Sequence, residues 1–138
     1  MVNSGSHSDG VFKAWIVGLI LGGKPEKALE FLAETYGVHV PSLKVGLPKG
    51  HKIKAFGCYT AKNQTIFVLN SDILANPFVI IHEFYHHLRS RGVDRLHRGT
   101  ERGADEFAMD FLREYETLVR CLSLGQMSSN QNRQSLAQ

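Results

Sequence analysis

The 138-residue sequence predicts an α+β fold with two N-terminal helices, a small and mostly antiparallel three-stranded sheet, and two further helices. Helical periodicity opens the chain and extends from Phe12 to Leu21, where Gly22-Gly23 ends it. In the middle of the chain the period changes to two, which is typical of strands. Near the end of the chain, apolar residues again recur every three or four positions, which is typical of a helix. The length fits one domain.

Two helices in tandem are expected at the start of the domain. Residues 1–10 are small and polar, and we expect them to be disordered, so that the folded domain covers residues 11–122. After the glycine pair, Pro25 suits the first turn of a second helix. Apolar residues at helical spacing extend this helix to Gly37.

The middle of the chain predicts short strands. The apolar residues Leu43, Val45 and Leu47 alternate with serine, lysine and glycine. Two short β-prone runs follow at 53–59 and 65–69, and the polar link between them suits a hairpin. We therefore expect a sheet of about three strands with mostly antiparallel pairing.

Two helices are expected after the strands. The pair Asn76-Pro77 is typical of a helix N-terminus, and this helix is predicted to continue to about Arg89. The last helix is predicted from near Thr100 to about Leu122. Its apolar residues form one regular stripe: Ala104, Phe107, Ala108, Phe111, Leu112, Tyr115, Leu118, Val119 and Leu122.

The chemistry that we predict is carried by the string His82-Glu83-Phe84-Tyr85-His86. On a helix, two histidines four residues apart project from nearly the same face, so their ring nitrogens suit a tetrahedral zinc site. Glu83 lies beside that face, where a carboxylate can take a proton from a zinc-activated water. The alternative is a helix with surface histidines, because three fixed positions also match by chance.

A catalytic zinc site needs a third protein ligand. The pattern HxxGxxH would need glycine at 89 and histidine at 92, but Arg89 and Gly92 stand there. His97 is one remaining candidate, and Glu101 is the one that we favour. Glu101 continues the apolar stripe one turn before Ala104, and a carboxylate at the head of a buried stripe needs a partner.

Asp105 lies one turn beyond Glu101, on the flank of the same helix. Its carboxylate would accept a hydrogen bond from the free ring nitrogen of a ligand histidine. A purely structural role for Glu101 is the alternative, because carboxylates in a first turn are stabilised by the helix dipole.

The HExxH string at 82–86 and the segment ExxAD at 101–105 together resemble the pattern of gluzincin zinc peptidases. The brevity of the chain is similar to that of the minigluzincins, and the resemblance covers roughly residues 65–112. It implies a zincin-like fold and peptide-bond hydrolysis with bound Zn²⁺. Residue by residue, it implies zinc ligands at His82, His86 and Glu101, a general base at Glu83 and a second-shell role for Asp105.

The resemblance also implies a place for the peptide or protein substrate. In zincin folds the strand before the active-site helix borders the cleft, and residues 65–69 are the matching run. An exposed strand edge would pair with an extended peptide through its backbone groups. The alternative is that this strand lies inside the sheet.

The link between the last two helices is strongly basic, with Arg89, Arg91, Arg95, Arg98 and Arg102 beside His87 and His97. A solvated link, with Arg102 balancing Glu106, is one interpretation. A nucleic-acid-associated regulatory protease is another, similar to SprT-like proteases, although no aromatic residues are interleaved to stack on bases. His97 or Arg98 would also suit the stabilisation of an oxyanion.

Two further alternatives stay open. The spacing of Glu101, Ala104, Phe107 and Ala108 also resembles the ImmA/IrrE metallopeptidases, although Tyr85 stands where those proteins often have glycine. An inactive or latent zinc-binding module is the second alternative. Residues 123–138 are polar and aperiodic, so we expect a flexible tail long enough to fold back over the metal.

Composition bounds the partners and the compartment. The chain has 16 basic and 13 acidic residues, a balance that permits an acidic partner without requiring one. Cys58 and Cys121 are too few for a disulfide scaffold, and we expect free thiols in the cytoplasm. The apolar run 14–21 is far shorter than the ~20 residues that cross a bilayer. The sequence gives no oligomeric state.

Overall fold

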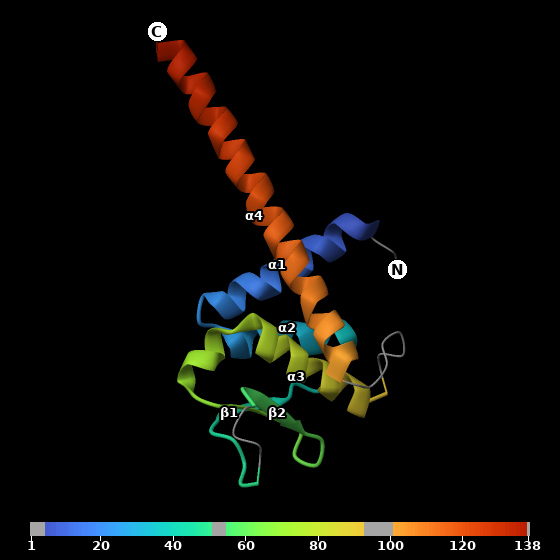
Figure 1. The fold of residues 1–138 in the computed structure, drawn as a ribbon. Helices are drawn as coiled ribbons and strands as arrows, with labels where there is room; N and C mark the ends of the chain where they lie inside the picture. The colour runs from blue at the N-terminus through green and yellow to red at the C-terminus, as the bar shows by residue number, and fades with distance from the viewer. Residues whose placement is uncertain (1–4, 51–54, 93–100, 138) are drawn as a thin grey trace.

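The computed structural model describes residues 5–50, 55–92 and 101–137. The described residues form four α-helices, one 3-10 helix and a three-stranded sheet, so the fold is α+β (Figure 1). In chain order the elements are α1 (Gly5–Leu21), α2 (Pro25–Tyr36), β1 (Ser42–Val45), β2 (Gly57–Thr60), β3 (Thr65–Val68), η1 (Ser71–Ala75), α3 (Pro77–Ser90) and α4 (Glu101–Ala137).

The second helix begins and ends as the sequence predicts. Pro25 occupies its first turn, where a missing backbone N–H costs nothing. Gly37 ends it in the left-handed region at φ 71°, a conformation that glycine adopts without strain. The backbone N–H of Val38 then donates to the Ala33 carbonyl and closes the last turn.

The first and last helices are longer than predicted. α1 already includes Gly5–Gly10, ahead of the Phe12 start that we predicted, and α4 continues past Leu122 to Ala137. The added part of α1 passes close to α4 at Gly10, where a Cβ would lie 2.5 Å from Glu114 Oε1. No proline interrupts the sequence after Glu101, so nothing forces α4 to stop.

The sheet has the strand order β1-β3-β2 and is mixed. β2 and β3 form the predicted hairpin, with Gly57 opposite Val68 and Thr60 opposite Thr65. The prediction of mostly antiparallel pairing is wrong for the other pair, because β1 lies parallel to β3. The long connection between β1 and β2 returns the chain, so that the hairpin places β3 rather than β2 beside β1.

β3 is the central strand, with β1 on one side and β2 on the other. The prediction that residues 65–69 offer a free edge to a substrate is therefore wrong, and the alternative that this strand lies inside the sheet is confirmed. Within the part of the chain that the structure describes, β2 pairs with β3 alone. β2 is thus an edge strand, and it packs against α3.

The core is built from buried side chains of all four α-helices and of β3, and α3 is the helix that packs on the sheet. The apolar stripe of α4 is buried as far as Phe111, but Val119 and Leu122 are exposed. Figure 1 shows the reason, since α4 passes α1 and then continues alone to the C-terminus. Among the described residues, no helix has the length and the apolar character to cross a bilayer. Cys58 and Cys121 are free thiols, as predicted.

Candidate metal centre

α3 carries the two histidines and fixes their direction. The side chain of Asn76 accepts a hydrogen bond from the backbone N–H of Val79 at 3.2 Å, and Pro77 follows as the first helical residue. The first turns of α3 are buried and apolar, which anchors the helix against the core. As a result His82 reaches the surface only in part, with 8% of the residue exposed.

Glu101, the first described residue of α4, contacts both histidines. Its Oε1 lies 2.7 Å from His86 Nε2, and its Oε2 lies 3.2 Å from His82 Nε2. The three side chains can each offer one ligand atom, and these atoms lie within 4.8 Å of one another. The structure thus brings together the three residues that the sequence predicts as ligands, although they come from two helices.

Close packing of α3 against α4 makes this meeting possible. Ala104 and Ala108 are fully buried, and small side chains let the two helices approach. The rings of Tyr85 and Phe107 pack with their centroids 5.3 Å apart. Gly103 is also buried, at the same end of α4. The backbone of α4 therefore passes close enough to α3 for Glu101 to reach both imidazoles.

The donor set could hold a metal ion. In a tetrahedral site with bonds of about 2.0–2.1 Å, neighbouring donor atoms lie roughly 3.3 Å apart. The contacts of 2.7 and 3.2 Å come from the two different oxygens of Glu101, so they place this carboxylate beside both imidazoles without fixing the geometry of a particular ion. Three protein ligands would leave one position open around a tetrahedral ion.

The surroundings of Glu101 differ from the prediction. We expected a buried carboxylate in need of a partner, but the Glu101 side chain is 78% exposed. Burial falls instead on the two histidines, whose side chains are 10% and 23% exposed. Glu101 approaches them from the solvent side because it lies at the end of α4, ahead of the buried stripe.

Burial also favours the form of His86 that binds metals. Desolvation lowers the pKa of His86 below its ordinary value, against the opposing attraction of the Glu101 carboxylate. A lowered pKa keeps more of the imidazole neutral near pH 7. The neutral ring has the free nitrogen lone pair that a metal requires.

Asp105 lies behind His82, on the side away from Glu101. Its Oδ1 is 2.9 Å from His82 Nδ1, while Glu101 contacts the Nε2 of the same ring. The distance suits a hydrogen bond, but the geometry does not align, and His82 Nδ1 is otherwise buried without a partner. The contact therefore places the Asp105 carboxylate beside the Nδ1 side of the His82 ring.

Glu83 lies beside the three ligands without joining them. Its Oε2 is 3.9 Å from His82 Nε2, and only 6% of the residue is exposed. Burial, and secondly the nearby Glu101 carboxylate, raises the pKa of Glu83 from 4.5 to about 8. In the absence of a metal the side chain therefore holds its proton at neutral pH. A bound cation would favour the ionised carboxylate.

A hollow of about 660 Å³ opens in front of these groups. β2 and the residues around it form one wall, and α3 forms the other. The hollow is lined by Gly50, Ala55, Gly57, Cys58, Tyr59, Ala61, Glu83, His86, Ser90 and Glu101. The sequence did not reveal the contribution of β2, because the edge strand was expected elsewhere.

Gly57 allows β2 to pass close to Glu83. A Cβ at this position would lie 2.8 Å from Val79 Cγ1, 3.1 Å from the Phe67 carbonyl oxygen and 3.4 Å from Glu83 Cγ. A side chain here would therefore press on Val79 of α3 and on the Phe67 carbonyl of β3, next to Glu83. The signal in the sequence was a glycine inside a β-prone run, which often marks a close backbone approach.

His87 is a buried hydrogen-bonding residue and not part of the basic link, where we placed it. Its Nε2 donates to the His39 carbonyl at 2.7 Å, so Nδ1 is left to accept from the Tyr59 hydroxyl at 2.7 Å. Burial lowers the pKa of His87, which favours this neutral form. The residue joins α3 to β2 and to the segment after α2.

Other predicted residues lie away from the centre or outside the described chain. His97, Arg95 and Arg98 lie outside the described residues. Arg102 is exposed on α4. The C-terminal end of α4 lies about 54 Å along the helix axis from Glu101 at 1.5 Å per residue, and Figure 1 shows it leading away from the body. This arrangement gives no support to a tail folded over the metal.

The chain was compared with protein-family models, curated proteins and solved structures. No protein-family model, curated protein or solved structure matches the chain.

Proposed function

We propose that the chain is a zinc-dependent peptidase of zincin-like fold, in which His82, His86 and Glu101 hold the metal. The observation that supports this most is the position of the Glu101 carboxylate, 2.7 Å and 3.2 Å from the two imidazoles. These two contacts join α4 to α3 at the hollow that Glu83 also lines. A ligand set, a neighbouring base and an open approach are the parts that metal-assisted hydrolysis needs.

Zinc in such a site lowers the pKa of a water and polarises a carbonyl group. The residues of the chain supply the rest of the proposed mechanism. Glu83 accepts a proton from the attacking water and passes it to the leaving amine, for which its position at the hollow is suited. Asp105, whose Oδ1 lies 2.9 Å from His82 Nδ1, is the residue placed to orient the His82 ring with its Nε2 toward Glu101.

β2 is the proposed wall against which the substrate lies. It is an edge strand, it lines the hollow through Gly57, Cys58 and Tyr59, and it faces α3. This position replaces the β3 edge that we predicted from the sequence. A protein substrate would have to present an extended segment, because the hollow is open and bordered by a strand.

Metal removal and replacement on the wild-type chain is the test. The protein is treated with a chelator, dialysed and resupplied with Zn²⁺, and hydrolysis of a mixture of unstructured peptides is followed by mass spectrometry. We expect cleavage with one equivalent of Zn²⁺ and none without it. Stoichiometric zinc binding with no cleavage of any peptide would instead support a non-catalytic zinc-binding module.

A further inference from the structure

A second hollow adjoins the candidate metal centre. It has a volume of about 520 Å³ and is lined by Gly37, Val38, His39, Ser90 and Arg91. Ser90 lines both this hollow and the one in front of the metal ligands. It lies one turn after His86 on α3. The two hollows therefore have one lining residue in common, at the last turn of that helix.

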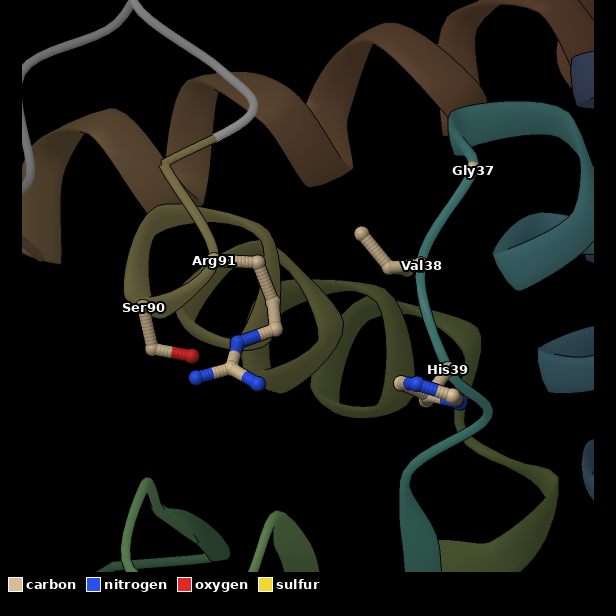
Figure 2. Close-up of a pocket in the computed structure, with 5 residues that line it drawn as sticks. All are labelled: Gly37, Val38, His39, Ser90 and Arg91. Atoms are coloured by element: carbon tan, nitrogen blue, oxygen red, sulfur yellow. The ribbon is translucent and has the colours of Figure 1, made fainter.

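Arg91 gives the second hollow its charge. In Figure 2 its side chain extends from the end of α3 into the hollow, and the guanidinium lies between Ser90 and His39 in this view. No acidic residue is among the five described residues that line the hollow. Within the described part of the chain, no carboxylate forms an ion pair with Arg91. Among the described residues, the guanidinium is therefore available to an anionic group that enters the hollow.

The end of α3 does not need the Arg91 side chain as a cap. The backbone N–H of Arg91 already donates to the carbonyls of His87 and Leu88, and that of Gly92 donates to Arg89. The hydroxyl of Ser90 also donates to His87, at 2.7 Å. With these carbonyls satisfied, capping does not explain why the guanidinium lies in the hollow.

Tyr59 fixes the boundary between the two hollows. Its hydroxyl donates to His87 Nδ1 at 2.7 Å and lies 3.3 Å from Ser90 Oγ. His87 in turn is held by the carbonyl of His39, a residue that lines the second hollow. The edge strand, α3 and the segment after α2 are thereby fixed relative to one another. The second hollow consequently keeps a set position beside the metal ligands.

We propose that Arg91 selects peptides that carry a carboxylate a short distance from the scissile bond. Arg91 follows His86 by five residues, which separates them by about 7.5 Å along the helix axis and by about 140° around it. An extended peptide advances about 3.3 Å per residue, so the carboxylate belongs at least about two residues from the cleaved bond. It is either an acidic side chain or the C-terminal carboxylate of the peptide. This inference rests on the proposed peptidase function for the position of the scissile bond.

Peptide binding to the zinc-loaded Glu83→Gln protein tests the selection without turnover. One set of short fluorescent peptides carries a single glutamate moved through every position, with glutamine counterparts and an amidated C-terminus. A second set, of varied length, compares a free C-terminal carboxylate with the amide. We expect one placement of the carboxylate to bind about three- to five-fold more tightly than its neutral partner, as for an exposed ion pair.

Three further variants assign the preference to Arg91. Arg91→Met should abolish it, Arg91→Lys should retain part of it, and Arg120→Met should leave it intact, because Arg120 lies far along α4. Equal binding of all charged and neutral partners, or a preference that survives Arg91→Met, overturns the proposal. A preference lost in Arg91→Met, in a chain whose wild type cleaves nothing, refutes the peptidase and retains the carboxylate site.

Discussion

The carboxylate of Glu101 contacts the imidazole of His86, with Oε1 2.7 Å from Nε2. This contact joins the first turn of α4 to the middle of α3 across 15 residues of sequence. Among the described residues, the group that could hold a metal ion takes two ligands from α3 and one from α4, so this contact is what completes it. β2 lines the same hollow as Glu101 and His86.

Zinc content should depend on the three ligands. His82→Ala or Glu101→Ala should lower the affinity for zinc at least tenfold, because two remaining donors hold the ion poorly. Glu106→Ala removes a neighbouring exposed carboxylate of α4 and is the matched control. Metal analysis after dialysis against limiting zinc measures the effect. His97→Ala is expected to retain the metal, and loss of zinc in this variant would show that the third ligand is wrong.

Gly57→Ala should disturb the wall of the hollow. The added Cβ meets Val79 Cγ1 at 2.8 Å and the Phe67 carbonyl at 3.1 Å, so β2 or α3 has to move. We expect a loss of about 1–3 kcal/mol in the free energy of unfolding, together with slower hydrolysis. Gly125→Ala is the control, because nothing lies within 4 Å of its Cβ position and alanine favours a helix. Denaturant titration compares the two, and equal stabilities would rule out the close approach.

Tyr59→Phe should destabilise the fold by leaving His87 Nδ1 without its donor. Loss of a partner for a buried polar atom costs about 1–3 kcal/mol. Tyr115→Phe is the control, since its hydroxyl makes no hydrogen bond to the residues described here. Thermal or urea unfolding of the metal-free proteins measures the difference. If the two variants unfold alike, the hydrogen bond between Tyr59 and His87 does not stabilise the fold as we expect.

The metal-free protein should lose stability as the pH rises from about 4.5 to about 8. The folded state raises the pKa of Glu83 to about 8 from 4.5, so it binds this proton more tightly than the unfolded chain does. Below pH 4.5 both states are protonated, and between the two values the unfolded chain releases its proton first. The slope is at most about 1.4 kcal/mol per pH unit.

Urea unfolding across this pH range, in the presence of a chelator, measures that slope. Glu83→Gln should remove it, because the amide does not titrate, whereas Glu30→Gln on the exposed face of α2 should leave it unchanged. A slope that persists in Glu83→Gln would assign the effect to other groups and contradict the burial of an ionisable Glu83.

Most of the candidate site could be predicted from the local spacing of residues in the sequence. The face shared by His82 and His86 follows from the period of a helix, and the position of Glu101 follows from the period of the next one. The prediction of Glu101 rested on burial, however, and the structure exposes its side chain. The position was predictable because helical geometry is local. The exposure was not, because it depends on where α4 begins relative to α3.

Tertiary relationships account for what the sequence did not predict. The parallel pairing of β1 with β3 joins strands that are not neighbours in sequence, and no local period encodes such a choice. The same choice makes β2 the edge strand and places Gly57 beside Glu83. The burial of His87 likewise depends on Tyr59 and on the His39 carbonyl, which are distant in the chain.

Zinc content and peptide turnover of Glu83→Gln test the central proposal most directly. The variant keeps all three proposed ligands and the size of the side chain, so it should bind one zinc per chain with unchanged affinity. Hydrolysis should fall by at least about a hundredfold, because an amide cannot accept the proton of the attacking water. A zinc-loaded Glu83→Gln protein that cleaves peptides at the wild-type rate would contradict the assignment of Glu83 and the mechanism built on it.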